Sequence, residues 1–111
     1  MPHVATVLVV DDEESIRQLL GVWIRALGHH VLEADSALAA LEVVRAVSVH
    51  VAVCDIVMPH RDGRWLIEEL RRDHPSTAIV IATGLDDLSP TVTLGPGVAA
   101  YVLKPYELGT F

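Results

Sequence analysis

The chain alternates short runs of β-branched and other apolar residues with amphipathic stretches, and this alternation limits the folds open to it. The apolar runs have the length and composition of strands that are buried on both faces of a sheet. Strands that alternate with helices predict βαβ units with right-handed crossovers, and hence an α/β fold around a parallel sheet. The predicted strands are Val4–Val10, His30–Ala34, Val49–Cys54, Ala78–Ala82 and Ala99–Leu103.

Between these strands, apolar residues recur at the spacing of one helix face. The first helix is predicted over Ile16–Leu27, with acidic residues before its first turn and Gly28 as its stop. Ser36 is expected to cap a second helix that ends near Ala46, and a third helix is expected over Arg64–Asp73. The side chains predicted to pack inward are Ile16, Leu19, Leu20, Trp23, Ile24, Leu27, Leu38, Leu41, Val44, Val47, Leu66, Ile67 and Leu70.

The pattern breaks towards the end of the chain. Where a helix is due before the last strand, Ser89–Gly97 is rich in proline, glycine and β-branched residues, so a loop or a shortened helix is expected there. The chain then ends at Phe111, before the helix that should follow the last strand. We expect a single domain over residues 1–111, truncated before its last helix. We also hypothesise that the uncovered apolar face promotes self-association into a homodimer.

The charge balance is acidic, with 8 Lys and Arg against 15 Asp and Glu and a net charge of −7. This argues against direct contact with nucleic acid, which usually involves a basic patch. No apolar run approaches the roughly 20 residues that span a membrane, and the first residues lack the basic start of a secretory signal. Cys54 is the only cysteine, and its side chain is expected to face the core, opposite to that of Asp55. A cytoplasmic protein is expected.

Acidic residues stand where two of the predicted strands end. Asp11 and Asp12 follow the first strand, and Asp55 follows the third. In an open parallel sheet, ligands bind outside the carboxyl ends of the strands, and these two strands are expected to be neighbours. Carboxylates that converge there repel one another unless they protonate, take up a cation or are held apart. A hard divalent cation such as Mg²⁺ suits such a cluster best.

The last two predicted strands end at Thr83 and Lys104. Lys104 is the only lysine, and an ammonium that faces a carboxylate cluster is suited to neutralise a transferred phosphoryl group. The hydroxyl of Thr83 is suited to donate a hydrogen bond to the same group. The histidines do not have the spacing of metal ligands, so a zinc site is not expected.

At this point the sequence resembles a known family, the receiver domain of two-component response regulators in the CheY-like superfamily. The resemblance covers nearly the whole chain, and its motifs occur in the order and at the spacing of that family. The motifs are Val9–Glu13, Cys54–Pro59 with Asp62 and Gly63, Ala82–Gly84 and Tyr101–Pro105. The resemblance implies a flavodoxin-like, doubly wound parallel sheet of five strands in the order 2-1-3-4-5. The fourth helix region is then degenerate and the final helix is missing.

The resemblance also implies roles for individual residues. Asp55 would be the phosphoacceptor, receiving a phosphoryl group from a sensor histidine kinase, a phosphotransfer protein or a small phosphodonor. Mg²⁺, or Mn²⁺ in its place, would be bound by Asp11, Asp12, Asp55 and the backbone carbonyl of Val57. Such a domain is a phosphoprotein of a phosphorelay that catalyses only its own phosphorylation and dephosphorylation, so it is not a turnover enzyme.

The remaining motif residues would sense the phosphoryl group. Lys104 would pair with its oxygens. Thr83 would move toward the phosphate, and Tyr101 would follow it inward and report the change to the signalling surface.

Two other functions stay open at this stage. One is a pseudo-receiver, an interaction module that keeps the fold and is not phosphorylated. The other is a Mg²⁺-dependent phosphohydrolase with an aspartyl nucleophile. Such an enzyme generally needs a second acid shortly after the nucleophile, and the residue two positions after Asp55 is Val57.

Overall fold

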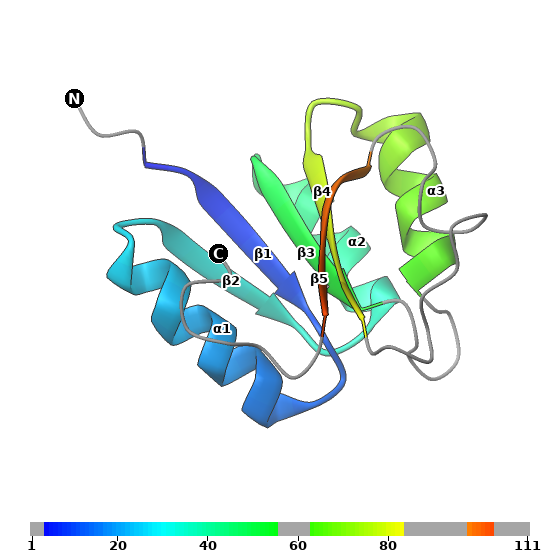
Figure 1. Ribbon diagram of the computed structural model, residues 1–111. Coiled ribbons are helices and arrows are strands. Elements are labelled where there is room, and N and C mark those ends of the chain that lie inside the picture. Colours follow the sequence, from blue (N-terminus) through cyan, green and yellow to red (C-terminus); the bar gives the residue numbers. More distant parts are fainter. Residues whose placement is uncertain (1–3, 56–62, 84–97, 104–111) are drawn as a thin grey trace.

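A computed structural model describes residues 4–55, 63–83 and 98–103, and its centre is a parallel sheet (Figure 1). The sheet has the strand order β2-β1-β3-β4-β5, and every neighbouring pair is parallel. The predicted α/β fold with a parallel sheet is thereby confirmed. The strands are β1 (Thr6–Val10), β2 (His30–Ala34), β3 (Val51–Asp55), β4 (Ala78–Thr83) and β5 (Val98–Leu103).

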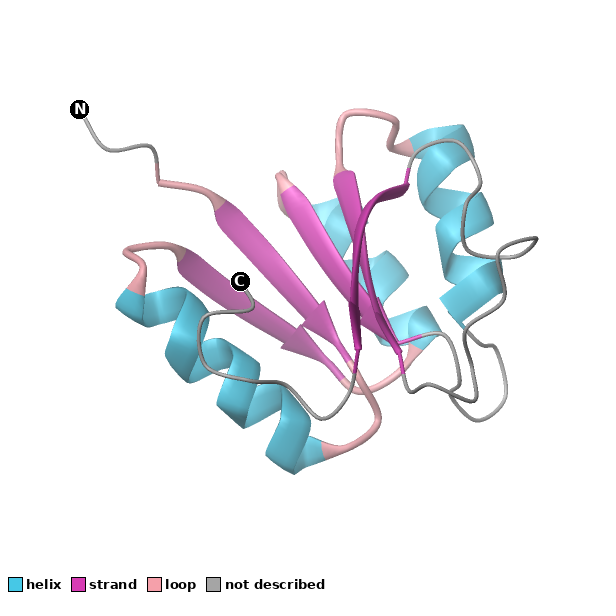
Figure 2. Cartoon of the chain, in the orientation of Figure 1, coloured by secondary structure: helices cyan, strands magenta, loops and turns pink. Residues whose placement is uncertain are grey.

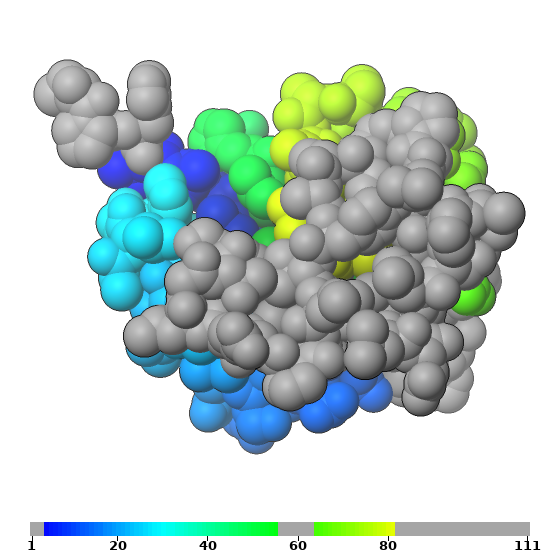
Figure 3. All heavy atoms as spheres, viewed as in Figure 1, coloured from blue at the N-terminus to red at the C-terminus, as the bar shows by residue number. Residues whose placement is uncertain are grey.

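Helices cover both faces of the sheet (Figure 2). Among the described residues they are α1 (Glu14–Ala26), α2 (Ala37–Ala46) and α3 (Gly63–Asp73). One face lies under α1, and the other lies under α2 and α3. In the space-filling view, the atoms of α1 and β2, blue to cyan, lie on the opposite side of the molecule from those of α3 (Figure 3).

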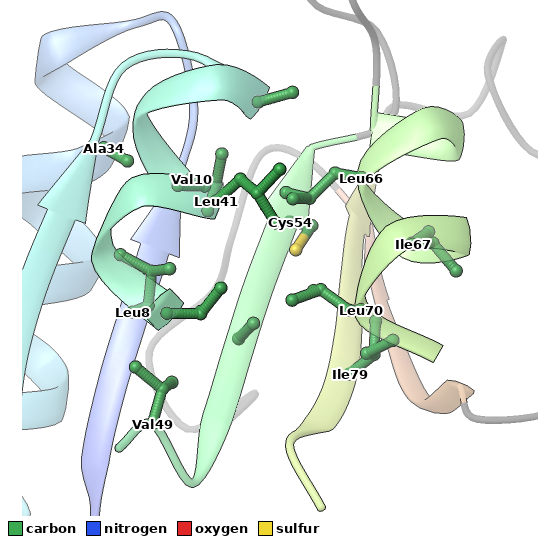
Figure 4. Close-up of a cluster of buried hydrophobic side chains, with 14 of the residues drawn as sticks. Leu8, Val10, Ala34, Leu41, Val49, Cys54, Leu66, Ile67, Leu70 and Ile79 are labelled. Atoms are coloured by element: carbon green, nitrogen blue, oxygen red, sulfur yellow. The ribbon is translucent and has the colours of Figure 1, made fainter. Parts of the chain in front are cut away.

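The alternation of side chains along β1 divides the core between these two faces. Val7 and Val9 pack with Leu20 and Ile24 of α1 in the smaller cluster. The larger cluster lies between the sheet and the helices α2 and α3, and its side chains converge on β3 (Figure 4). Cys54 is fully buried in this larger cluster, as predicted. The larger cluster consists of Leu8, Val10, Ala34, Ala37, Ala40, Leu41, Val44, Val49, Ala52, Cys54, Leu66, Ile67, Leu70, Ile79 and Ile81.

The predicted caps are present at both of the helix ends for which a cap was predicted. The hydroxyl oxygen of Ser36 accepts a hydrogen bond of 3.1 Å from the backbone N–H of Ala39 at the start of α2. At the end of α1, Gly28 has a φ of +93°. The N–H groups of Gly28 and His29 donate to carbonyls of the last turn of α1, which is the Schellman arrangement.

Two predicted strands begin later than expected. The first ladder begins at Thr6 rather than Val4, whose side chain is 53% exposed. The third begins at Val51 rather than Val49, and the carbonyl of Val49 accepts a hydrogen bond of 2.8 Å from the hydroxyl of Thr77. Val49 is nevertheless buried, so its apolar character reflects packing and not membership of the ladder.

Some residues predicted to pack inward are exposed instead. Leu27 and Val47 lie beyond the last turns of α1 and α2, at the C-cap positions, where the chain leaves the helix face. Leu19 and Leu38 lie at the borders of their helix faces, and small residues such as Gly21 and Ala40 occupy the inward positions. The exposed fractions are 38% for Leu19, 60% for Leu27, 52% for Leu38 and 45% for Val47.

The predicted loop Ser89–Gly97 and the predicted absence of a last helix before Phe111 lie outside the described residues. The expectations of a truncated domain and of a homodimer therefore stay predictions. Within residues 4–55, 63–83 and 98–103, no helix is long and apolar enough to cross a membrane.

Candidate functional site

The carboxylates of Asp11, Asp12 and Asp55 meet at one edge of the sheet. Asp11 directly follows β1, and Asp55 is the last residue of β3. The two strands are neighbours, and Val10 pairs with Cys54, so the residues that follow them come together. One carboxylate oxygen from each of the three residues lies within 4.8 Å of the others. The convergence predicted from the strand ends is therefore present in the structure.

The three carboxylates differ in their access to water. Asp11 is 1% exposed and Asp55 is 4% exposed, whereas Asp12 is exposed. Two like charges about 4 Å apart repel by about 4 kcal/mol at an effective dielectric constant of 20. Positive charge at this place would therefore offset the repulsion, and Asp12 is the one carboxylate of the three that is exposed to solvent.

Asp11 is held by main-chain and side-chain contacts. Its N–H donates to the carbonyl of Ala34 at the end of β2, over 3.1 Å. Its Oδ1 accepts a hydrogen bond of 2.9 Å from the N–H of Glu13, and its carbonyl accepts one of 2.8 Å from Nη1 of Arg17. The turn between β1 and α1 is thus fixed from both sides.

Arg17 was missed as a residue of this site by the sequence analysis. The signal that bears on it is the helix spacing of Arg17 and Arg25, two arginines that form a short basic stripe beside the apolar face of α1. That stripe alone does not tell which acidic side chain or carbonyl Arg17 contacts. The contact depends on where β2 lies, and this follows only from the tertiary structure.

The donor set fits a hard divalent cation. All three groups are carboxylates, the ligand type that Mg²⁺ and Mn²⁺ share, and Mg²⁺ usually takes a few carboxylates together with waters and a phosphate oxygen. The thiol of Cys54 lies beside Asp55 in sequence but is buried in the core on the α2–α3 face. Burial, reinforced by the Asp55 charge, raises the pKa of this thiol to about 12, so it stays protonated and is a poor ligand.

The other predicted site residues lie near this edge or outside the described part of the chain. Thr83 is the last residue of β4, and Ala82 before it pairs with Asp55. Tyr101 lies in β5, where its backbone pairs with Ile81. The side chains of Thr83 and Tyr101 lie outside the description, as do Val57 and Lys104 altogether.

The sequence and the fold were compared with those of known proteins. Residues 7–111 match the model of the response regulator receiver domain family. The probable transcriptional regulator ycf27 of Guillardia theta is 36% identical over 102 residues, which cover 91% of this chain and 40% of that protein. Response regulator RR06 of Streptococcus pneumoniae is 28% identical, over 92% of this chain and 47% of that protein. The chain thus spans less than half the length of these curated relatives.

Solved structures agree with the sequence relatives. A response regulator receiver domain protein from Clostridium thermocellum superposes with a TM-score of 0.84 at 30% identity, and the match covers 93% of this chain and 84% of that one. The chemotaxis protein CheY4 of Vibrio cholerae gives a TM-score of 0.87 at 26% identity, over 97% of this chain and 92% of that one.

Proposed function

The chain belongs to the response regulator receiver domain family, and on this premise we propose that Asp55 accepts a phosphoryl group in a phosphorelay that depends on Mg²⁺. The observation that supports this proposal is the group of three converging carboxylates, two of them buried. A buried acidic cluster of this kind is difficult to explain as solvated surface charge, because each added charge raises the repulsion.

In this proposal Asp11, Asp12 and Asp55 hold the cation, together with the backbone carbonyl of Val57. When bound, Mg²⁺ or Mn²⁺ supplies positive charge that offsets the carboxylates and the negative charge of an incoming phosphoryl group. Asp11 is well suited to a ligand role because its contacts to Glu13, Ala34 and Arg17 fix its orientation before any cation arrives.

The chemistry proposed for Asp55 is nucleophilic. A carboxylate oxygen of Asp55 attacks phosphorus of a phosphohistidine, a P–O bond forms, and the P–N bond breaks. The imidazole nitrogen keeps the electron pair and takes up a proton, and the chain is left with an acyl phosphate. Lys104 is proposed to neutralise the phosphoryl oxygens, while Thr83 and Tyr101 are proposed to carry the change to the surface.

The proposed partner is a sensor histidine kinase or a phosphotransfer protein. The relatives are named as transcriptional regulators and a response regulator, and this chain spans less than half of each. We therefore propose that this domain receives the signal and makes no nucleic-acid contact of its own, consistent with its net charge of −7. The domain acts only on itself and turns over no separate substrate.

Intact-mass spectrometry after incubation with acetyl phosphate and Mg²⁺ tests the proposal. We expect the mass to rise by one phosphoryl group, and we expect no rise in the Asp55→Asn variant or after the metal is removed with EDTA. Absence of the gain in a chain that is folded by circular dichroism and is given Mg²⁺ would reject phosphorylation and favour the pseudo-receiver function.

A further inference from the structure

Arg17 links the turn that carries two of the site carboxylates to the neighbouring strand β2. Its Nη1 donates to the carbonyl of Asp11 over 2.8 Å, and its Nε lies 3.4 Å from Oε1 of Glu33. The Arg17 side chain is 15% exposed and that of Glu33 is 33% exposed, so the guanidinium is the more shielded partner of the pair. A guanidinium presents several donors in a rigid plane, which allows it to hold two partners in a defined geometry.

Glu33 stands at a suitable position to orient this guanidinium. It is the residue before Ala34 on β2, and its backbone pairs with Val9 of β1. The carbonyl of Ala34 accepts the N–H of Asp11, so adjacent residues of β2 contact Asp11 directly and through Arg17. The N–H of Asp11 therefore bonds directly to the end of β2, and its carbonyl is linked to the same strand through Arg17 and Glu33.

We propose that Arg17 is a positioning residue for the cation, acting through the carbonyl of Asp11, and that Glu33 holds Arg17 in place. The bond from Arg17 goes to the carbonyl, so it uses no carboxylate oxygen that a cation needs. It fixes the peptide between Asp11 and Asp12 and thereby aims both carboxylates. The proposal rests on the proposed function, because it concerns the same cation.

Arg25 provides a matched comparison on the same helix. Its Nη2 lies 4.0 Å from the other oxygen of Glu33, and its side chain is 54% exposed. It shares the acidic partner with Arg17 but lies two turns further along α1, away from the β1–α1 turn. A purely structural role for the pairs with Glu33 predicts that a folded chain lacking either arginine keeps its Mn²⁺ affinity, whereas a positioning role predicts weaker Mn²⁺ binding for loss of Arg17 alone.

The test measures binding of Mn²⁺ to the unphosphorylated chain, from the paramagnetic resonance signal of free Mn²⁺. We expect Arg17→Ala to weaken Mn²⁺ binding about 10-fold, a loss typical of residues that orient metal ligands. Arg17→Lys keeps the charge but replaces the planar guanidinium by a single ammonium group, and its Mn²⁺ affinity is expected to lie between those of Arg17→Ala and the unchanged chain. Arg25→Ala is expected to bind Mn²⁺ as the unchanged chain does.

A second measurement follows phosphorylation by acetyl phosphate at low and at saturating Mg²⁺. We expect Arg17→Ala to be phosphorylated slowly at low Mg²⁺ and at the normal rate at saturating Mg²⁺, because the variant is impaired only in binding the cation. If Arg17→Ala does not fold, Glu33→Gln replaces it, with a smaller loss of Mn²⁺ affinity expected.

Unchanged Mn²⁺ affinity in folded Arg17→Ala, or an equal loss in Arg25→Ala, would overturn the positioning role. In that case the unchanged chain still binds Mn²⁺ and is phosphorylated, so the proposed function stands. An unchanged chain that binds no Mn²⁺ and takes up no phosphoryl group would overturn both proposals together.

Discussion

Asp11 and Asp12 are neighbours in sequence but differ in solvent exposure. The sequence predicts both as ligands from their place after a strand, and the structure brings both to Asp55. It also separates them, since Asp11 is buried and has contacts to Glu13 and Arg17, whereas Asp12 is exposed. Of these two neighbouring carboxylates, therefore, only that of Asp12 faces solvent.

Cys54 precedes Asp55 on β3, and its side chain is buried on the α2–α3 face of the sheet. The titration of its thiol gives a prediction for how stability depends on pH. Burial raises the pKa of its thiol from 9.0 to about 12. The folded chain therefore keeps a proton that the unfolded chain loses above pH 9.0, so stability falls as the pH rises from there toward 12. Relative to Cys54→Ala, we expect the unchanged chain to lose roughly 1 kcal/mol of stability between pH 8 and pH 10.

Urea denaturation of both chains at the two pH values measures this difference. The comparison cancels the titration of the tyrosines, which both chains share. A stability difference between the two chains that stays constant from pH 8 to pH 10 would contradict the prediction.

For single residues, the sequence predicts a position in the fold where that position follows from one helix or strand alone. The strand-end acids and the inward side chain of Cys54 are of this kind. Arg17 and Glu33 are not, because they lie 16 positions apart and meet only when α1 packs beside β2. Residues whose contacts depend on the packing of two elements have no local signal.

Helix α1 contains Gly21 within it and is followed by Gly28, and substitution by alanine should act in opposite directions at the two sites. A Cβ on Gly21 would meet Nη1 of Arg25 at 3.1 Å, a half-exposed side chain that is free to shift. We expect Gly21→Ala to stabilise the fold by about 0.5 kcal/mol, because alanine favours helix. Gly28 has a φ of +93° in open space, so we expect Gly28→Ala to destabilise by about 1 kcal/mol.

Thermal unfolding of the two variants beside the unchanged chain checks both signs. Both variants add the same methyl group, so opposite signs of the change in unfolding temperature would reflect the helical backbone at Gly21 and the positive φ at Gly28. Destabilisation by both variants would show that Arg25 does not give way.

At the scale of elements, helix ends with side-chain or glycine caps are predicted better than strand ends. Ser36 and Gly28 determine their helix ends through local hydrogen bonds and backbone conformation. The start of β3 has no such local cap, and the carbonyl of Val49 just before it accepts a hydrogen bond from Thr77, 28 positions further along the chain. The bounds of β2, His30–Ala34, agree with the prediction, and all five of its residues pair with β1.

For the whole molecule, a cation bound as proposed at the acidic cluster would couple the stability of the fold to the cation concentration. A cation that binds only the folded chain stabilises it by about 2.7 kcal/mol at 100 times its dissociation constant. We therefore expect the midpoint of thermal unfolding to rise with Mg²⁺ in the unchanged chain. Without metal, we expect the midpoint of thermal unfolding to be higher in the Asp12→Asn variant than in the unchanged chain, because the repulsion among the carboxylates falls. We expect Mg²⁺ to raise the midpoint of this variant only weakly.

The control is Asp35→Asn, which removes the same charge from an exposed site after β2, outside the cluster. Its response to Mg²⁺ should match that of the unchanged chain. An equal response in Asp12→Asn would show that Mg²⁺ acts at some other place or through ionic strength alone.

The pairing of β1 with β3 has a consequence for how the chain is made. Asp11 and Asp55 come from strands that are neighbours in space but are separated along the chain by α1, β2 and α2. When β1, α1 and β2 have been synthesised, the nascent chain still lacks Asp55 and so has no complete carboxylate cluster. The carboxylate cluster therefore cannot form before β3 has been synthesised and has paired with β1.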